Sequence, residues 1–238
     1  MGRYTKDDLD RYFEYNVFPS KRLLYLGSRS DTDGEESGVN YEMFDCFLKG
    51  ITYLDSIADS PITVHMNTDG GDWYHGMAMF RAIRACRSHV TVMAWGYACS
   101  MGSVILQAAD TRVLARNCVV MIHDGTGGIP PNAGAKTEEA WAEQSKKTRV
   151  EMYQIFLERM KVADHRMTLR RVEEMCSHDR IFSPEEAVEA GLADWVMHTF
   201  KDADHQADGG KYAPSSLKSE REKVACKKRK MGNDSAGT

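Results

Sequence analysis

Ser100 stands where an apolar segment ends and a helix is expected to begin, within WGYACSMGS at residues 95–103. A helix N-terminus offers free backbone N–H groups and a partial positive charge. A serine hydroxyl here could attack a carbonyl carbon while nearby N–H groups stabilise the developing charge. A serine that only caps the helix would occupy the same position. Ala98, two residues earlier, disfavours the G-x-S-x-G turn of α/β-hydrolases.

His123 is the candidate general base. It follows the apolar run 119–122 and precedes a glycine-rich stretch, and an imidazole at a strand end can accept a proton near neutral pH. A purely structural histidine would fit the same pattern. Neighbouring residues of an extended strand point to opposite sides, so the adjacent Asp124 is poorly placed to orient His123. Asp179 is the other candidate carboxylate, although it could also pair with Arg180 or belong to a turn.

The turn NTDGGDWYHG at residues 67–76 brings Gly70 and Gly71 directly after a predicted strand. Paired glycines there can place a backbone N–H against a ligand and contribute to an oxyanion hole. A tight strand-to-helix turn would need the same residues. The other histidines form no ligand-like grouping and no zinc spacing is present, so we expect neither a metal nor a cofactor.

The elements that would position these residues alternate between strands and helices. Alternation of this kind favours an α/β fold with parallel strand pairing. The apolar pattern predicts strands at 21–27, 61–66, 90–95, 111–115 and 118–122, with a strand or edge at 192–197. It predicts helices at 41–58, 76–86, 100–110, 137–162 with Thr137 as N-cap, 169–175, and 184–190 capped by Ser183 and ended by Gly191.

Composition narrows the class of protein. The 238 residues suffice for one domain, and a net charge of -4 argues against a nucleic-acid-binding protein. No run of 18 apolar residues predicts a membrane span, and the charged N-terminus does not resemble a signal peptide, so we expect a cytoplasmic protein away from membranes. The six cysteines form no C-x-x-C pair and fit free thiols. Residues 199–238, including KKRK at 227–230, are predicted to form a polar, disordered tail.

Four segments together resemble the proteolytic subunit of the Clp protease (ClpP) family, within the crotonase-like superfamily, over residues 21–197. Residues 67–71 read NTDGG where that family typically has N-S-P-G-G, and residues 96–102 read GYACSMG for G-x-A-A-S-M-G. Residues 121–128 read MIHDGTGG for M-I-H-x-P-x-G-G. Residues 178–194 keep the aspartate, serine, Glu-Ala, Gly-Leu and final aspartate of R-D-x-x-x-S-x-x-E-A-x-x-x-G-L-x-D.

The resemblance implies a serine-type endopeptidase with a single α/β domain of ββα-spiral units and a protruding handle helix. Carried over by position, Ser100 is the nucleophile, His123 the general base and Asp179 the acid that orients it. Gly71 and Met101 would supply the oxyanion N–H groups. The domain would span 21–198, after an N-terminal segment at 1–20.

The resemblance also implies partners: a homo-oligomeric ring of six or seven subunits, single or stacked in pairs, an AAA+ unfoldase, and unfolded proteins or short peptides as substrates. Asp69 and Cys99 depart from the family pattern, and Ser177 with His178 replaces a charged pair that commonly bridges two rings. Alternatives left open are a phage capsid-maturation protease of the same fold, a non-catalytic ring subunit and a crotonase-like acyl-CoA enzyme.

Overall fold

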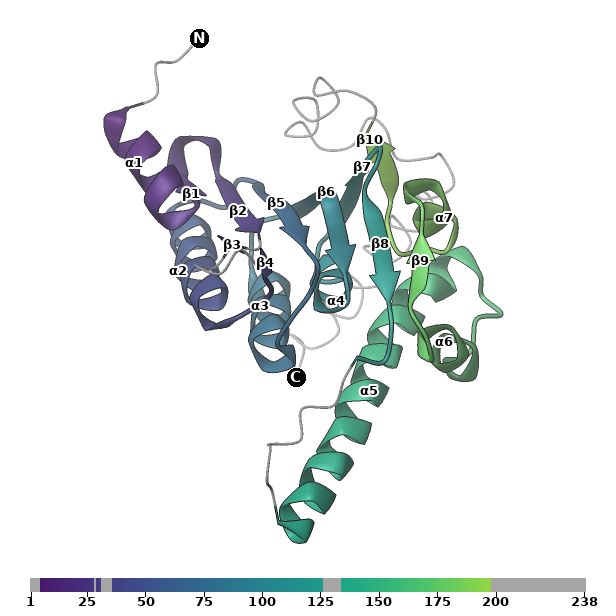
Figure 1. The fold of residues 1–238 in the computed structure, drawn as a ribbon. Coiled ribbons are helices and arrows are strands. Elements are labelled where there is room, and N and C mark those ends of the chain that lie inside the picture. Colours follow the sequence, from purple (N-terminus) through teal and green to yellow (C-terminus); the bar gives the residue numbers. More distant parts are fainter. Residues whose placement is uncertain (1–4, 28, 31–35, 126–133, 198–238) are drawn as a thin grey trace, which may run out of the picture. The chain divides into compact units, whose positions relative to one another are not determined.

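The computed structural model describes residues 5–27, 29–30, 36–125 and 134–197. Within these ranges the chain folds around an eight-stranded sheet (Figure 1). Six of its strands lie in the order β1-β2-β5-β6-β7-β10, while β8 pairs with β6 and β9 pairs with β8. The strands are β1 (Val17–Phe18), β2 (Leu23–Gly27), β5 (Ile62–Thr68), β6 (Val90–Cys99), β7 (Thr111–Ala115), β8 (Val119–Ile122), β9 (Arg180–Phe182) and β10 (Trp195–Met197). A separate antiparallel pair consists of β3 (Arg29–Ser30) and β4 (Glu36–Ser37).

The helices lie between these strands along the chain, although β7 is followed directly by β8 and α5 directly by α6. They are α1 (Lys6–Tyr15), the 3-10 turn η1 (Pro19–Lys21), α2 (Tyr41–Ile57), α3 (Trp73–Ala85), α4 (Met101–Leu106), α5 (Ala135–Ala163), α6 (Leu169–Cys176) and α7 (Pro184–Glu189). The apolar spacing of α2 buries Phe47, Ile51 and Leu54, as expected for an amphipathic helix. Ser183 caps α7 through a reciprocal bond with Glu186, as the sequence predicts.

Strand β6 belongs to two parts of the sheet. Its first half, Thr91 to Ala94, pairs with β7, and its second half, Tyr97 to Cys99, pairs with β8. Both pairings are parallel, as predicted, whereas β1–β2 and β8–β9 are antiparallel. The change of neighbour places the end of β6 beside β8 instead of β7, and Ser100 follows directly after it.

Several predicted boundaries are wrong. Strand β6 continues to Cys99 instead of ending at residue 95, and the short helix after it ends at Leu106. The N-cap of α5 is Gly134, three residues before the predicted Thr137. Helix α1 and strand β9 have no counterpart in the sequence-based prediction.

The chain divides into two units, Met1–His198 and Thr199–Thr238. The second unit, which carries the predicted disordered tail, lies outside the described residues. Among the described helices, none has the length and apolar character needed to cross a bilayer.

Candidate active site

Ser100 lies between the end of β6 and the first residue of α4. Its backbone has φ 50° and ψ -121°, a region that L-residues adopt at a cost of about 1–3 kcal/mol. The Ser100 amide donates to the Met121 carbonyl at 2.9 Å, and the Ser103 hydroxyl donates to the Ser100 carbonyl at 2.6 Å. The Ser100 side chain caps none of the described amides of α4. These contacts hold the backbone in the strained turn and leave the hydroxyl for another partner.

That partner is His123, the residue after β8. Its Nε2 lies 2.7 Å from Ser100 Oγ, and its Nδ1 lies 3.0 Å from Asp179 Oδ1. If Nδ1 carries the proton and donates to Asp179, Nε2 is left to accept from the serine hydroxyl. The structure therefore brings Ser100, His123 and Asp179 into one chain of contacts.

The register of β8 and β9 explains how His123 meets Asp179. The two strands are antiparallel, and Ile122 pairs with Arg180. One step further along each strand, His123 faces Asp179. The side chain of Asp179 is 67% exposed and that of His123 is 25% exposed, so the carboxylate reaches the imidazole from the solvent side.

Asp124 has different partners. Its carboxylate accepts from the Tyr153 hydroxyl at 2.6 Å, and its amide donates to the Cys176 carbonyl at 2.7 Å. The carboxylate placed against the His123 ring is therefore Asp179.

The glycine turn lies beside the serine. Gly70 and Gly71 have φ of 122° and 136°, values that L side chains rarely adopt. A Cβ on Gly70 would lie 2.6 Å from the Ser100 Cβ, so only glycine allows this approach.

The orientation of the turn is set by Val39. The Val39 amide donates to the Gly70 carbonyl, and the Asp72 amide donates to the Val39 carbonyl at 2.8 Å. Because successive amides of an extended chain alternate in direction, the Gly71 amide faces away from Val39, and Gly71 lines the same cleft as Ser100. The Met101 amide is the first of α4 and has no acceptor within that helix. Gly71 and Met101 thus line the same cleft as Ser100.

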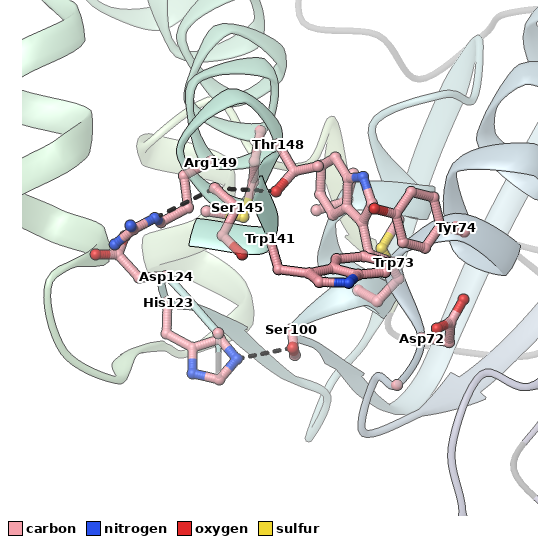
Figure 2. A pocket seen from close by; sticks show the side chains of 15 residues that line it. Asp72, Trp73, Tyr74, Ser100, His123, Asp124, Trp141, Ser145, Thr148 and Arg149 are labelled. Atoms are coloured by element: carbon pink, nitrogen blue, oxygen red, sulfur yellow. Dashed lines mark hydrogen bonds between the residues drawn. The ribbon is translucent and has the colours of Figure 1, made fainter. Parts of the chain in front are cut away.

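A cleft of about 670 Å³ opens over these residues. Figure 2 shows Trp73, Tyr74 and Trp141 gathered on the opposite side of Ser100 from His123. Val104 and Met152 add apolar lining. Trp73 and Tyr74 begin α3 and Trp141 comes from α5, so two separate helices form this wall. The sequence-based prediction assigned none of these side chains to the site.

The thiols near the site are poor nucleophiles. Cys99, next to Ser100, is buried; burial raises its pKa, and the charge of Asp69 adds to the effect. Burial likewise raises the pKa of Cys118 and of Cys176 to about 12. Thiols of this kind stay protonated at neutral pH, which leaves the Ser100 hydroxyl as the nucleophile best placed in the cleft.

The far end of α4 is held by two arginines, the half-buried Arg159 and the buried Arg112. Arg159 of α5 donates to the carbonyls of Gln107 and Ala109, and Arg112 donates to both oxygens of Asp194. Burial lowers the pKa of Arg159 to about 10, so it remains charged at neutral pH. Both ends of the helix that follows Ser100 are thus held in place.

The fold and the site describe an α/β protein with an assembled Ser–His–Asp constellation. Comparison with known proteins adds its family: the model described as "Clp protease" matches residues 36–200, and the chain belongs to the Clp protease family. An ATP-dependent Clp protease proteolytic subunit from Deinococcus radiodurans is 31% identical over 189 residues, covering 78% of this chain and 85% of that protein. A proteolytic subunit 3 from Streptomyces avermitilis is 28% identical, covering 78% of each chain.

A solved structure agrees with the fold. A ClpP1 mutant from Listeria monocytogenes superimposes with a TM-score of 0.66 at 20% identity, covering 81% of this chain and 98% of that one. The predicted family and the predicted ClpP-like fold class are thus confirmed. Family membership and the named relatives support a protease.

Proposed function

We propose that this chain is a serine endopeptidase in which Ser100, His123 and Asp179 form the catalytic triad. The observation that carries the proposal is the pair of contacts at His123, 2.7 Å to Ser100 Oγ and 3.0 Å to Asp179 Oδ1. These are hydrogen-bond distances suited to proton transfer from the nucleophile to its base.

The reaction follows from these positions. Ser100 Oγ attacks the peptide carbonyl carbon while His123 Nε2 takes the hydroxyl proton, and Asp179 stabilises the resulting imidazolium. The amides of Gly71 and Met101 donate to the oxyanion of the tetrahedral intermediate. His123 then passes its proton to the leaving amine, and the acyl-enzyme is hydrolysed by a water molecule that His123 deprotonates.

The cleft supports peptide substrates with a large apolar side chain near the cleaved bond. Its aromatic wall of Trp73, Tyr74 and Trp141 offers apolar surface beside Ser100. We propose that the substrates are short peptides and unfolded chains. For folded proteins we propose an AAA+ unfoldase partner, in line with the ATP-dependent naming of the Deinococcus relative.

We also propose that the chain forms a homo-oligomeric ring of six or seven subunits that encloses these sites, single or stacked in pairs. Helix α5 supports this: its 29 residues bury Met152, Tyr153, Phe156 and Met160, all in its second half. The first half extends away from the sheet in Figure 1. It still carries Trp141, and the exposed Val150 lies just past the midpoint of the helix. Apolar surface on such an extension suits contact with another subunit.

Sedimentation of the purified full chain tests this assembly. We expect a species several times the 26.8 kDa of one chain at micromolar concentration. A second species of twice the ring mass would indicate stacked rings. A monomer alone under these conditions would contradict the ring while leaving the triad untouched.

A fluorophosphonate probe tests the catalytic proposal. In the expected reaction Ser100 Oγ bonds to phosphorus, fluoride leaves, and His123 accepts the hydroxyl proton. We expect one adduct per chain, mapped to Ser100, and loss of peptide hydrolysis in proportion to labelling. The matched control is Ser145→Ala, which removes another hydroxyl that lines the cleft and should still be labelled. No adduct would instead favour the non-catalytic ring subunit, and an adduct at another residue would contradict the assignment of Ser100 as the nucleophile.

A further inference from the structure

Asp124 joins three segments of the site without touching the nucleophile. It follows His123 directly, and its amide donates to the carbonyl of Cys176, the last residue of α6, at 2.7 Å. Asp179 comes three residues after Cys176. The carboxylate of Asp124 accepts from the hydroxyl of Tyr153, on α5, at 2.6 Å. The segments that carry His123 and Asp179 are therefore tied to each other and to α5 at this one residue.

Tyr153 is suited to be a permanent donor in this contact. It is 6% exposed and lies in the buried half of α5, between Met152 and Phe156. Burial and the hydrogen bond to Asp124 both raise the pKa of Tyr153 above its usual value. The phenol therefore keeps its proton at neutral pH and presents an O–H to the carboxylate.

The pair of His123 and Asp179 needs such support because its own contacts are sparse. Strands β8 and β9 pair over only three residue pairs, and the last of these is Ile122 with Arg180. His123 and Asp179 lie just beyond that end, and the Asp179 side chain is 67% exposed. The bonds made by Asp124 continue the connection past the end of the strands, which limits how far the His123 backbone can move from Asp179.

We propose that Tyr153 is a positioning residue for the triad: its hydroxyl holds Asp124, and through Asp124 it sets the place of His123 between Ser100 and Asp179. This inference rests on the proposed serine endopeptidase function. Tyr153 touches neither of the two triad partners of His123 in the contacts described above, so its effect on the reaction is through geometry.

Tyr153→Phe removes only the hydroxyl and tests this role. We expect kcat on a fluorogenic peptide to fall about tenfold while KM stays within about twofold, because displacing the base slows bond making more than it weakens peptide binding. The rate of fluorophosphonate labelling should fall by a similar factor. Tyr15→Phe is the matched control, since Tyr15 is 59% exposed on α1, and it should leave kcat unchanged.

Variants of Asp124 separate positioning from general loss of structure. Asp124→Asn keeps an oxygen that can accept from Tyr153 and should retain most of kcat, whereas Asp124→Ala should match Tyr153→Phe. The double variant Tyr153→Phe with Asp124→Ala should be no slower than either single variant, because both remove the same contact. All rates are measured below the melting transition of each variant, followed by circular dichroism.

Several outcomes would overturn the role of Tyr153. One is a wild-type kcat in Tyr153→Phe, and another is a loss that appears only in KM. If the kcat losses of the two single variants multiply in the double variant, this also contradicts the role of Tyr153, because multiplied losses indicate independent effects. If the wild-type chain itself fails to react with the probe, the proposed function fails; if it reacts and Tyr153→Phe reacts equally fast, only the positioning role fails.

Discussion

Ser100→Ala is expected to lower the turnover of a model peptide by about 10⁶-fold, because triad members act as a unit and His123 has nothing to activate without the hydroxyl. The remaining rate would come from the oxyanion donors and substrate binding alone. Initial rates with a fluorogenic peptide, measured against a no-enzyme blank, give the ratio.

The alanine variant should keep its fold. Alanine retains the Cβ that packs against Gly70, and the side chain removed makes no cap to the described amides of α4. Circular dichroism and sedimentation should match those of the wild type. Ser145→Ala serves again as the control within the cleft. More than a few per cent of wild-type activity in Ser100→Ala would show that another group carries the reaction.

Asp179→Asn is expected to lower kcat by about 10³- to 10⁴-fold, whereas Asp124→Asn should cost less than about tenfold. An asparagine amide placed against Nδ1 can donate to it, which favours the tautomer whose protonated Nε2 cannot accept from Ser100. Asp124→Asn leaves the 3.0 Å contact between His123 and Asp179 in place.

Comparison of the two asparagine variants decides between the carboxylates. Both replace a carboxylate by an amide of the same shape, so each serves as the control for the other. Their rates are compared at matched thermal stability. A greater loss in Asp124→Asn would show that the wrong carboxylate has been assigned to His123.

Local pattern was sufficient for most elements of the fold. The apolar spacing of α2, the buried run in β6 and the Ser183 cap of α7 are signals within a few residues of each other, and each predicted its element. Strand β9 was missed because two of its three residues are exposed and it is held by pairing with β8. The extension of β6 to Cys99 likewise depends on its second partner, β8.

The candidate site residues that lie in short sequence motifs could be predicted from the sequence. Ser100, His123 and Asp179 each follow or precede a recognisable strand or helix end. Tyr153 and Trp141 lie on one long helix, and their place near the site depends on how α5 packs. The Tyr153–Asp124 contact spans 29 positions, and nothing local to either residue indicates it.

The strained turn at Ser100 has a consequence for the order of folding. The Ser100 amide is held by Met121, the glycine turn by Val39, and the residue after His123 by Cys176. These bonds join distant parts of the chain, and such contacts form only after the entropy of closing long loops has been overcome. We therefore expect the nucleophile to be assembled late in folding. Under the proposed function, a copy of this chain that is still folding would be a substrate before it could act as a protease.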